Sequence, residues 1–153
     1  MTGKEYLWQY REANAELKRI ESEISLIDDL LGSVTVDPTS EKVQSSHDPD
    51  QIGKLVARKV DMLDELDRKK AAMLELLREI CGVIEELSDP DERLLIQLRY
   101  VKMLSWRMVE REMRKAGMFY SEEWMMKHHR KAMKEVEMLT NCTVIYSKDS
   151  SIV

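Results

Sequence analysis

The sequence predicts an all-α protein: a long N-terminal helical hairpin or coiled coil, followed by shorter helices arranged as a helix-turn-helix. Three observations support this fold class. The 153 residues contain only five glycines and three prolines, and 35% of them are charged, which is typical of helical, coiled-coil-rich chains. Two long segments place apolar residues three and four positions apart. The C-terminal third contains several residue patterns that begin helices.

The first predicted helix runs from about Lys4 to Leu31 and is ended by Gly32. Charged residues occupy its other faces, as expected of an amphipathic helix with one buried stripe. The apolar stripe is formed by Tyr10, Ala13, Leu17, Ile20, Ile24, Ile27 and Leu31.

A long loop is predicted at about residues 32–48, because the segment GSVTVDPTSEKVQSSHDPDQIG mixes Ser, Asp, Pro and Gly without a helical period. We expect a short extended piece at 34–36. Asp48 is the expected N-cap of the next helix, with Pro49 in its first position. A loop of this length is uncommon within a compact domain.

The second long helix carries a stripe that only Lys59 and Lys69 interrupt. These lysines either set the register of the pairing or mark a partly exposed part of the stripe. Gly82 is expected to weaken the helix or mark a bend. The two long helices can form an antiparallel hairpin or part of a dimer, and the sequence does not choose. The stripe is formed by Ile52, Leu55, Lys59, Met62, Leu66, Lys69, Met73, Leu76, Ile80, Val83 and Leu87.

Three shorter helices are predicted after this stalk. Asp89 caps the first, with Pro90 in its first turn and Glu92 completing a capping box. Ser105 caps a second helix that ends at Gly117, and Ser121 caps a third that continues to about Leu139. The predicted organisation is therefore a stalk over 1–87, a helix-turn-helix domain over 88–140 and a loosely ordered tail over 141–153.

Several classes of protein are disfavoured. No stretch of about 18 apolar residues is present, so we expect no membrane span, and the first residues are too polar for a signal peptide. Cys81 and Cys142 stand apart, which favours a reduced, cytoplasmic chain without a structural zinc site. We find no nucleophile elbow, phosphate loop or dinucleotide motif and therefore expect neither an enzyme nor a cofactor.

Charge is distributed unevenly along the chain. Residues 1–98 carry 13 Lys and Arg against 22 Asp and Glu, a net charge of −9. Residues 99–134 carry 10 against 4, a net charge of +6, and the last 19 residues have a net charge of −2. The basic segment is suited to phosphate, whereas the acidic part would avoid nucleic acid.

The helix after Ser121 has two different faces. The inward face is expected to contain Met125, His128, Ala132, Val136 and Leu139, and the outward face Glu122, Glu123, Met126, Lys127, Arg130, Lys131 and Lys134. Adjacent imidazoles point about 100° apart on a helix, so His128 and His129 are not expected to share a metal. We place His128 in the core and His129 at the surface or on a phosphate. Apolar anchors behind polar and cationic groups are the arrangement that a DNA-reading helix needs.

The segments ERLLIQLRYVKMLSWRMVEREM and YSEEWMMKHHRKAMKEV resemble region four of bacterial sigma factors, and more specifically the RinA/ArpU-like phage activators of late genes. The similarity covers about residues 40–139, including a VQSS in the loop before the long acidic helix. The interval from Val109 to Ser121 is twelve residues, where the family has about eight. The resemblance rests on Leu98, Arg99, Tyr100, Ser105, Trp106, Val109, Met113, Ser121, Met125, Ala132 and Met133.

The resemblance implies a phage-type transcriptional activator in the cytoplasm of a bacterial host. It binds double-stranded DNA without a cofactor, and sigma-like members contact host RNA polymerase. The N-terminal helices could form a homodimer. The alternative is a coiled-coil scaffold or adaptor whose basic end binds an acidic partner. The candidate DNA-binding residues are Arg107, Arg111, Arg114, Lys115, Ser121, Glu122, Glu123, Met126, Lys127, His129, Arg130, Lys131 and Lys134.

Overall fold

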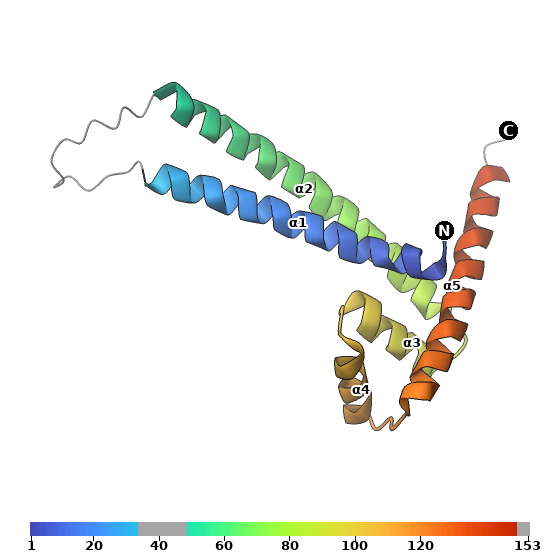
Figure 1. Ribbon diagram of the computed structural model, residues 1–153. Coiled ribbons are helices and arrows are strands. Elements are labelled where there is room, and N and C mark those ends of the chain that lie inside the picture. The colour runs from blue at the N-terminus through green and yellow to red at the C-terminus, as the bar shows by residue number, and fades with distance from the viewer. Residues whose placement is uncertain (34–48, 150–153) are drawn as a thin grey trace. The chain divides into compact units, whose positions relative to one another are not determined.

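A computed structural model describes residues 1–33 and 49–149, with side chains as far as Asn141. Within these residues all regular secondary structure is helical (Figure 1), which confirms the predicted all-α class. The expected Asp48 cap and the extended piece at 34–36 lie outside the described residues. The elements are α1 (Gly3–Gly32), α2 (Pro49–Glu85), α3 (Pro90–Ile96), the π-helical turn η1 (Gln97–Val101), α4 (Trp106–Lys115) and α5 (Glu122–Asp149).

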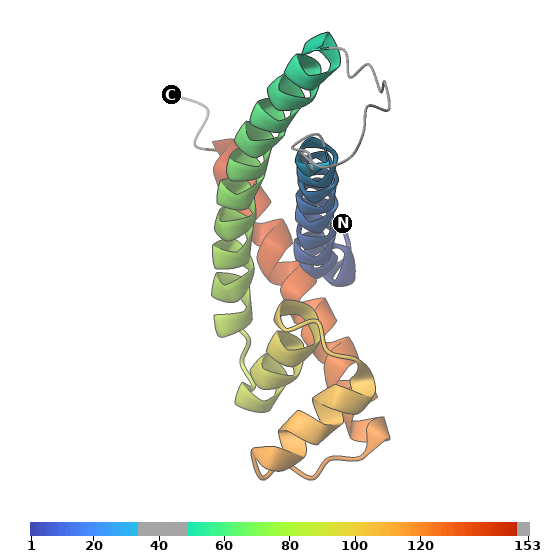
Figure 2. The ribbon, with the colours of Figure 1, turned by 90° about the vertical axis from the view of Figure 1, so that its left-hand side faces the viewer.

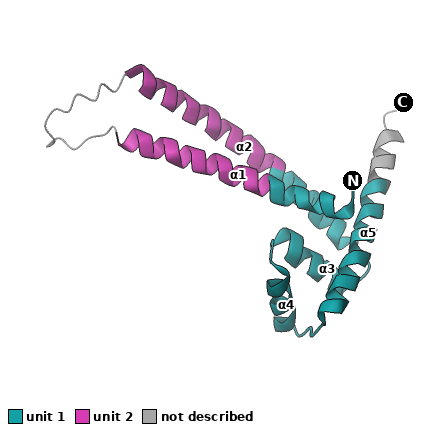
Figure 3. Cartoon of the chain, in the orientation of Figure 1, with its two compact units in different colours: residues 1–12, 73–153 teal, residues 13–72 magenta. Residues whose placement is uncertain are grey.

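The chain divides into two compact units, and both long helices pass from one unit into the other (Figure 3). Unit 2 comprises residues 13–72. Unit 1 comprises residues 1–12 together with 73–153, so it joins the two ends of the hairpin to the shorter helices. This division differs from the expected boundary between residues 87 and 88, because the start of α1 and the end of α2 share a core with the C-terminal helices.

Unit 2 is an antiparallel pair of helices, α1 and α2, which lie side by side in both views (Figures 1 and 2). The predicted stripes form its interior: Leu17, Ile20 and Ile27 from α1 are buried, as are Met62 and Leu66 from α2. Packing of one apolar stripe on another removes both from water, at about 25 cal/mol per Å² of apolar area. The arrangement within one chain is therefore a hairpin.

Lys59 and Lys69 each meet an acid of the facing helix. Lys59 Nζ pairs with Asp28, and Lys69 Nζ lies 2.8 Å from Glu16 Oε1. Both side chains are about one-third exposed. Both predicted explanations of these lysines therefore apply. The stripe is partly exposed at each lysine, and each lysine pairs with one acid across the hairpin, which can set the register.

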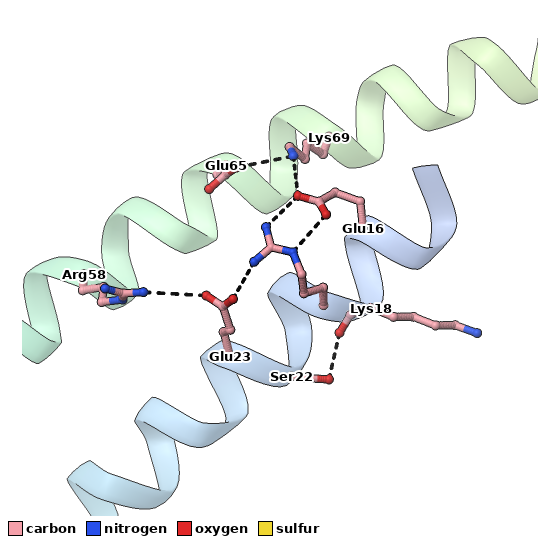
Figure 4. A network of polar contacts seen from close by, with 8 residues as sticks. Glu16, Lys18, Ser22, Glu23, Arg58, Glu65 and Lys69 are labelled. Atoms are coloured by element: carbon pink, nitrogen blue, oxygen red, sulfur yellow. Dashed lines mark hydrogen bonds and ion pairs between the residues drawn. The ribbon is translucent and has the colours of Figure 1, made fainter. Parts of the chain in front are cut away.

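The Lys69–Glu16 pair belongs to a network of charged side chains (Figure 4). Arg19 bridges Glu16 at 2.7 Å and Glu23 at 2.5 Å along α1. Arg58 of α2 lies 3.8 Å from Glu23. These bonds from Arg19 and Lys69 lower the pKa of Glu16 to about 2. Individual exposed pairs contribute little, but a sliding of the two helices would break several of them together.

The start of α1 is fixed by a capping box that the sequence analysis missed. The backbone N–H of Thr2 donates to Glu5 Oε2 at 2.7 Å, and the N–H of Glu5 donates to Thr2 Oγ1 at 3.2 Å. Thr2 is thus the N-cap and Glu5 the third helical residue, the usual spacing of this motif. Gly3 between them is buried against α5, where a Cβ would lie 2.3 Å from the carbonyl oxygen of Met133. Only glycine fits this close approach without a shift of the backbone.

One hydrophobic core of unit 1 joins α1, α2, the α3–η1 segment and α5. Its most buried aromatic side chain is Tyr100, which is 2% exposed and packs edge-on against Trp8 with ring centroids 5.3 Å apart. The core therefore packs α5 against the start of α1 and the end of α2. It comprises Leu7, Ile80, Ile84, Leu87, Ile96, Tyr100, Ala132 and Val136.

Asp89 caps α3 as predicted, and its Oδ1 accepts a hydrogen bond from the backbone N–H of Asp91 at 2.9 Å. The predicted capping box is wrong, however. Glu92 is completely buried, and its Oε1 lies 2.8 Å from Nδ1 of His128 in α5. Its carboxylate turns toward α5 because that helix packs on α3.

The predicted end of the last helix is also wrong. We expected it near Leu139 with a loosely ordered tail over 141–153, but α5 continues to Asp149. Within this helix Thr140 Oγ1 donates to the backbone carbonyl of Val136 at 2.9 Å, a local bond that helices tolerate. The β-branched residues of the tail were outweighed by helical propagation, because each added residue gains one backbone hydrogen bond.

Candidate nucleic-acid interface

A second core in unit 1 joins α3, η1, α4 and α5 into a small helical group (Figure 2). Half-buried side chains, including those of Trp106 and Trp124, pack against this core. The core orients the outer faces of α4 and α5. Its buried residues are Leu95, Leu98, Val109, Met113 and Met125.

Both ends of α4 are specified by local chemistry. Ser105 caps its start, with Oγ accepting from the backbone N–H of Met108 at 3.4 Å. At its end, Gly117 adopts a positive φ of 81°. The N–H of Met118 donates to the carbonyl of Met113 at 2.9 Å, and that of Gly117 donates to Arg114 at 3.0 Å. This is a Schellman motif, so α4 stops where the glycine was predicted to stop it.

The connector between α4 and α5, residues 116–121, is anchored by Tyr120. The Tyr120 hydroxyl donates to Asp91 Oδ2 at 2.5 Å, and its ring stacks on Trp124 at 3.6 Å. Ser121 caps α5 as predicted, accepting from the N–H of Trp124 at 3.2 Å. Phe119, in contrast, is 78% exposed. The longer interval from α4 to α5 is therefore an ordered turn with one projecting aromatic ring.

The predicted cations of α4 are all exposed. Arg107, Arg111 and Arg114 are spaced four and three residues apart, which places them in one row along the helix. They line a surface hollow of about 560 Å³ together with Ser105, Met108 and Glu110. Arg114 pairs with Glu110 at 2.8 Å, and Lys115 with Glu112 at 3.0 Å.

The predicted cations of α5 form a second row, at residues 127, 130, 131 and 134, and all four are exposed. Lys131 Nζ lies 3.4 Å from Glu92 Oε1. Among the residues that the structure describes, Lys127 and Lys134, like Arg107 and Arg111 of α4, have no acid within ion-pair distance. Such cations are available to an external anion without breaking an internal bond.

The other candidate residues of α5 differ in exposure. Glu122 and Glu123 are exposed in the first turn, where the helix dipole favours acids. Ser121 is exposed, but its hydroxyl is engaged in the cap. Met126, which was expected to point outward, is half-buried.

The surface position predicted for His129 is wrong. Its Nε2 lies 2.7 Å from the Tyr100 hydroxyl, its ring stacks on Tyr100, and the Trp106 ring meets it edge-on at 5.0 Å. Burial, reinforced by nearby cations that include Lys4 and Arg99, lowers the pKa of His129 to about 4. A neutral imidazole held in this stack does not form a charged contact with a phosphate at neutral pH.

Arg99 also organises this helical group, a role that was not predicted from the sequence. Its guanidinium lies over the rings of Trp8 and Trp106, at 5.5 and 5.0 Å from the ring centroids, and Nη1 donates to the carbonyl of Leu104 at 2.7 Å. Arg99 thus fixes the approach to α4 instead of facing solvent. The sequence feature that could have indicated this role is the position of Arg99 between the apolar residues Leu98 and Tyr100, both of which are buried.

No helix within the described residues combines the length and the apolar character needed to cross a membrane. Comparisons with models of protein families, with curated proteins and with solved structures give no match to this chain.

Proposed function

We propose that this protein is a DNA-binding transcriptional regulator in which α4 and α5 act as a helix-turn-helix on double-stranded DNA. The observation that carries the proposal is the pair of exposed cationic rows on these consecutive helices, with a capped, ordered turn between them. Cations that have no internal acid can neutralise phosphates and release counterions, which supplies most of the affinity for a duplex.

In this proposal α5 enters the major groove and α4 contacts the backbone, as in other helix-turn-helix proteins. Glu122 and Glu123, at the start of α5, are placed where a carboxylate can accept from cytosine N4. Lys127 and Lys134 hold the phosphates beside the groove. His129 is removed from the proposed contacts because it belongs to the aromatic stack.

The resemblance to phage activators of late genes extends the proposal to activation in a bacterial cytoplasm, with host RNA polymerase as a partner. The projecting Phe119 is the side chain best suited to an apolar contact near the DNA, since its ring is exposed while its neighbours Met118 and Tyr120 pack inward.

The test is selection of bound duplexes from a random pool, followed by affinity measurements at several salt concentrations. We expect an enriched motif and a steep salt dependence, with a slope of about −0.9 per phosphate contacted. The double variant Lys127→Gln with Lys134→Gln should weaken binding and reduce the slope by about 2.

The matched control removes two exposed cations of unit 2, Lys18→Gln with Arg68→Gln, for the same change in net charge. It should leave the slope unchanged. If both double variants behave alike, or if no motif is enriched and binding is weak even at low salt, α5 is not the DNA-reading element.

The alternative function is a scaffold that associates through its helices. One observation favours it: Val56, Val60 and Leu63 form an apolar row on α2 within unit 2, with exposures of 46%, 52% and 40%. An apolar row of this spacing is the usual seam of helix association. Self-association without salt-dependent DNA binding would favour the scaffold over the regulator.

A further inference from the structure

Among the residues that the structure describes, Glu92 is the one charged residue that is buried, and one of its two carboxylate oxygens has no hydrogen-bond partner. Its side chain is completely buried. Oε1 lies near Nδ1 of His128, whereas Oε2 has no hydrogen-bond partner among the described residues. A buried carboxylate oxygen without a partner is costly, and native proteins usually satisfy it with a donor, a water or an ion.

Two further ligand atoms lie beside this carboxylate. Asp89 uses Oδ1 to cap α3, which leaves Oδ2 at 3.9 Å from His128 Nδ1. The ligand atoms of Asp89, Glu92 and His128 all lie within 4.8 Å of one another. In a tetrahedral zinc site, ligand atoms about 2.1 Å from the metal are about 3.4 Å apart. The separations of 2.8 Å from Glu92 to His128 and 3.9 Å from Asp89 to His128 bracket that value.

The orientation of the His128 ring is fixed from outside the cluster. The ring stacks on Trp124 at 4.0 Å, and Trp124 in turn stacks on Tyr120. Tyr120 donates to Asp91 of α3, so the supporting chain returns to the helix that carries the two carboxylates. The stack limits rotation of the imidazole, an orienting role that hydrogen bonds to the second ring nitrogen usually have at metal sites.

We propose that Asp89, Glu92 and His128 bind one divalent transition-metal ion, with Zn²⁺ best matched to the set of one imidazole and two carboxylates. The ion coordinates His128 Nδ1 and an oxygen from each carboxylate, and the neutral imidazole then carries its ring proton on Nε2. Water fills the remaining position, as in zinc sites with three protein ligands. The ion clamps the start of α3 to the middle of α5. This inference does not depend on DNA binding.

In the absence of metal, the Lys131 ammonium pairs with the Glu92 carboxylate. Its ammonium lies 3.4 Å from Glu92 Oε1, but the side chain is 60% exposed and can withdraw into water. Lys131 therefore competes with the metal for Glu92, and its removal should strengthen metal binding. If the cluster were only an ion-paired structural contact, removal of Lys131 would confer no affinity for a metal.

The test uses the full chain without a polyhistidine tag, stripped with a chelator. Cobalt is titrated and followed by visible absorption, and Zn²⁺ binding is measured by calorimetry and by thermal unfolding. We expect one ion per chain, and an increase in Tm of about 8 °C when free Zn²⁺ reaches a hundredfold excess over Kd. His128→Gln should abolish the signal, and Lys131→Gln should raise affinity severalfold.

Asp89→Asn separates loss of a metal ligand from loss of the fold, because asparagine caps helices as well as aspartate does. It should lower affinity at least tenfold while the helical circular dichroism is retained. The control is Asp61→Asn, an exposed acid of α2 outside the cluster and its supporting contacts, which should bind metal normally. Absence of a cobalt band at millimolar metal would overturn the proposal, as would saturable binding that His128→Gln and Asp89→Asn leave unchanged.

Discussion

Acidification below pH 6.5 should destabilise this protein through His129, and removal of that imidazole should abolish the effect. In the folded state the ring lies between Tyr100 and Trp106, and its pKa is lowered to about 4 by burial and by the charges of Lys4, Arg99 and Arg130. In the unfolded chain the pKa returns to about 6.5. Between these values the unfolded state binds a proton that the folded state does not.

The sign follows from proton linkage. Because the folded pKa is the lower one, the free energy of unfolding is unaffected by His129 above pH 6.5, falls as the pH drops below that value, and stops falling below about pH 4. A shift of this size corresponds to about 3 kcal/mol before screening. The ring is only half-buried, so screening by solvent reduces the expected loss to about 1–2 kcal/mol.

The assay is urea unfolding at a series of pH values between 7 and 4, followed by circular dichroism in the presence of a chelator. The wild type is compared with His129→Phe, which can retain the stacking on Tyr100, and with His129→Gln, which can retain a hydrogen bond to its hydroxyl. Neither replacement titrates, so both should lose this part of the pH dependence whatever their stability at pH 7. A pH profile that both variants share with the wild type would refute the reasoning.

Three further outcomes are expected. Gly3→Ala should destabilise unit 1 by about 1–3 kcal/mol, because its Cβ would collide with the Met133 carbonyl; Gly82→Ala, which meets nothing within 4 Å, should instead stabilise by about 0.5–1 kcal/mol in urea unfolding. Glu16→Gln should remove a stabilisation that is present above pH 4.5 and is lost as the pH falls toward 2, since the pKa of Glu16 is about 2; acid titration of unfolding would detect this. Val60→Gln should weaken self-association in sedimentation without lowering stability, because this side chain is 52% exposed; an unchanged monomer–oligomer equilibrium would exclude the row from association.

Periodicity predicted the long helices well because burial in a helical pair depends on local spacing. The residues Leu17 and Ile20 were assigned to the interior from a three-and-four pattern, and both are buried. The caps at Asp89, Ser105 and Ser121 and the stop at Gly117 were also predicted. Each of these depends on groups that lie within five residues of each other in the sequence.

The candidate site was predicted in part. The exposed cations of α4 and α5 were identified because an amphipathic pattern separates them from the inward face. His129 and Glu92 were assigned wrongly, since the adjacent position on a helix or a capping motif gave a plausible local role for each. Their actual partners, Tyr100 and His128, lie 29 and 36 residues away in the sequence.

The sequence by itself determined the helices, their caps and the uneven charge, because these depend on propensity, spacing and composition within a few turns. Only the tertiary structure shows which residues form unit 1 and that His129 packs against Tyr100. It also shows that Glu92 is buried beside Asp89 and His128. The physical reason is that burial and pairing between distant helices set the cost of a polar group, and no local pattern encodes which distant side chain will satisfy it.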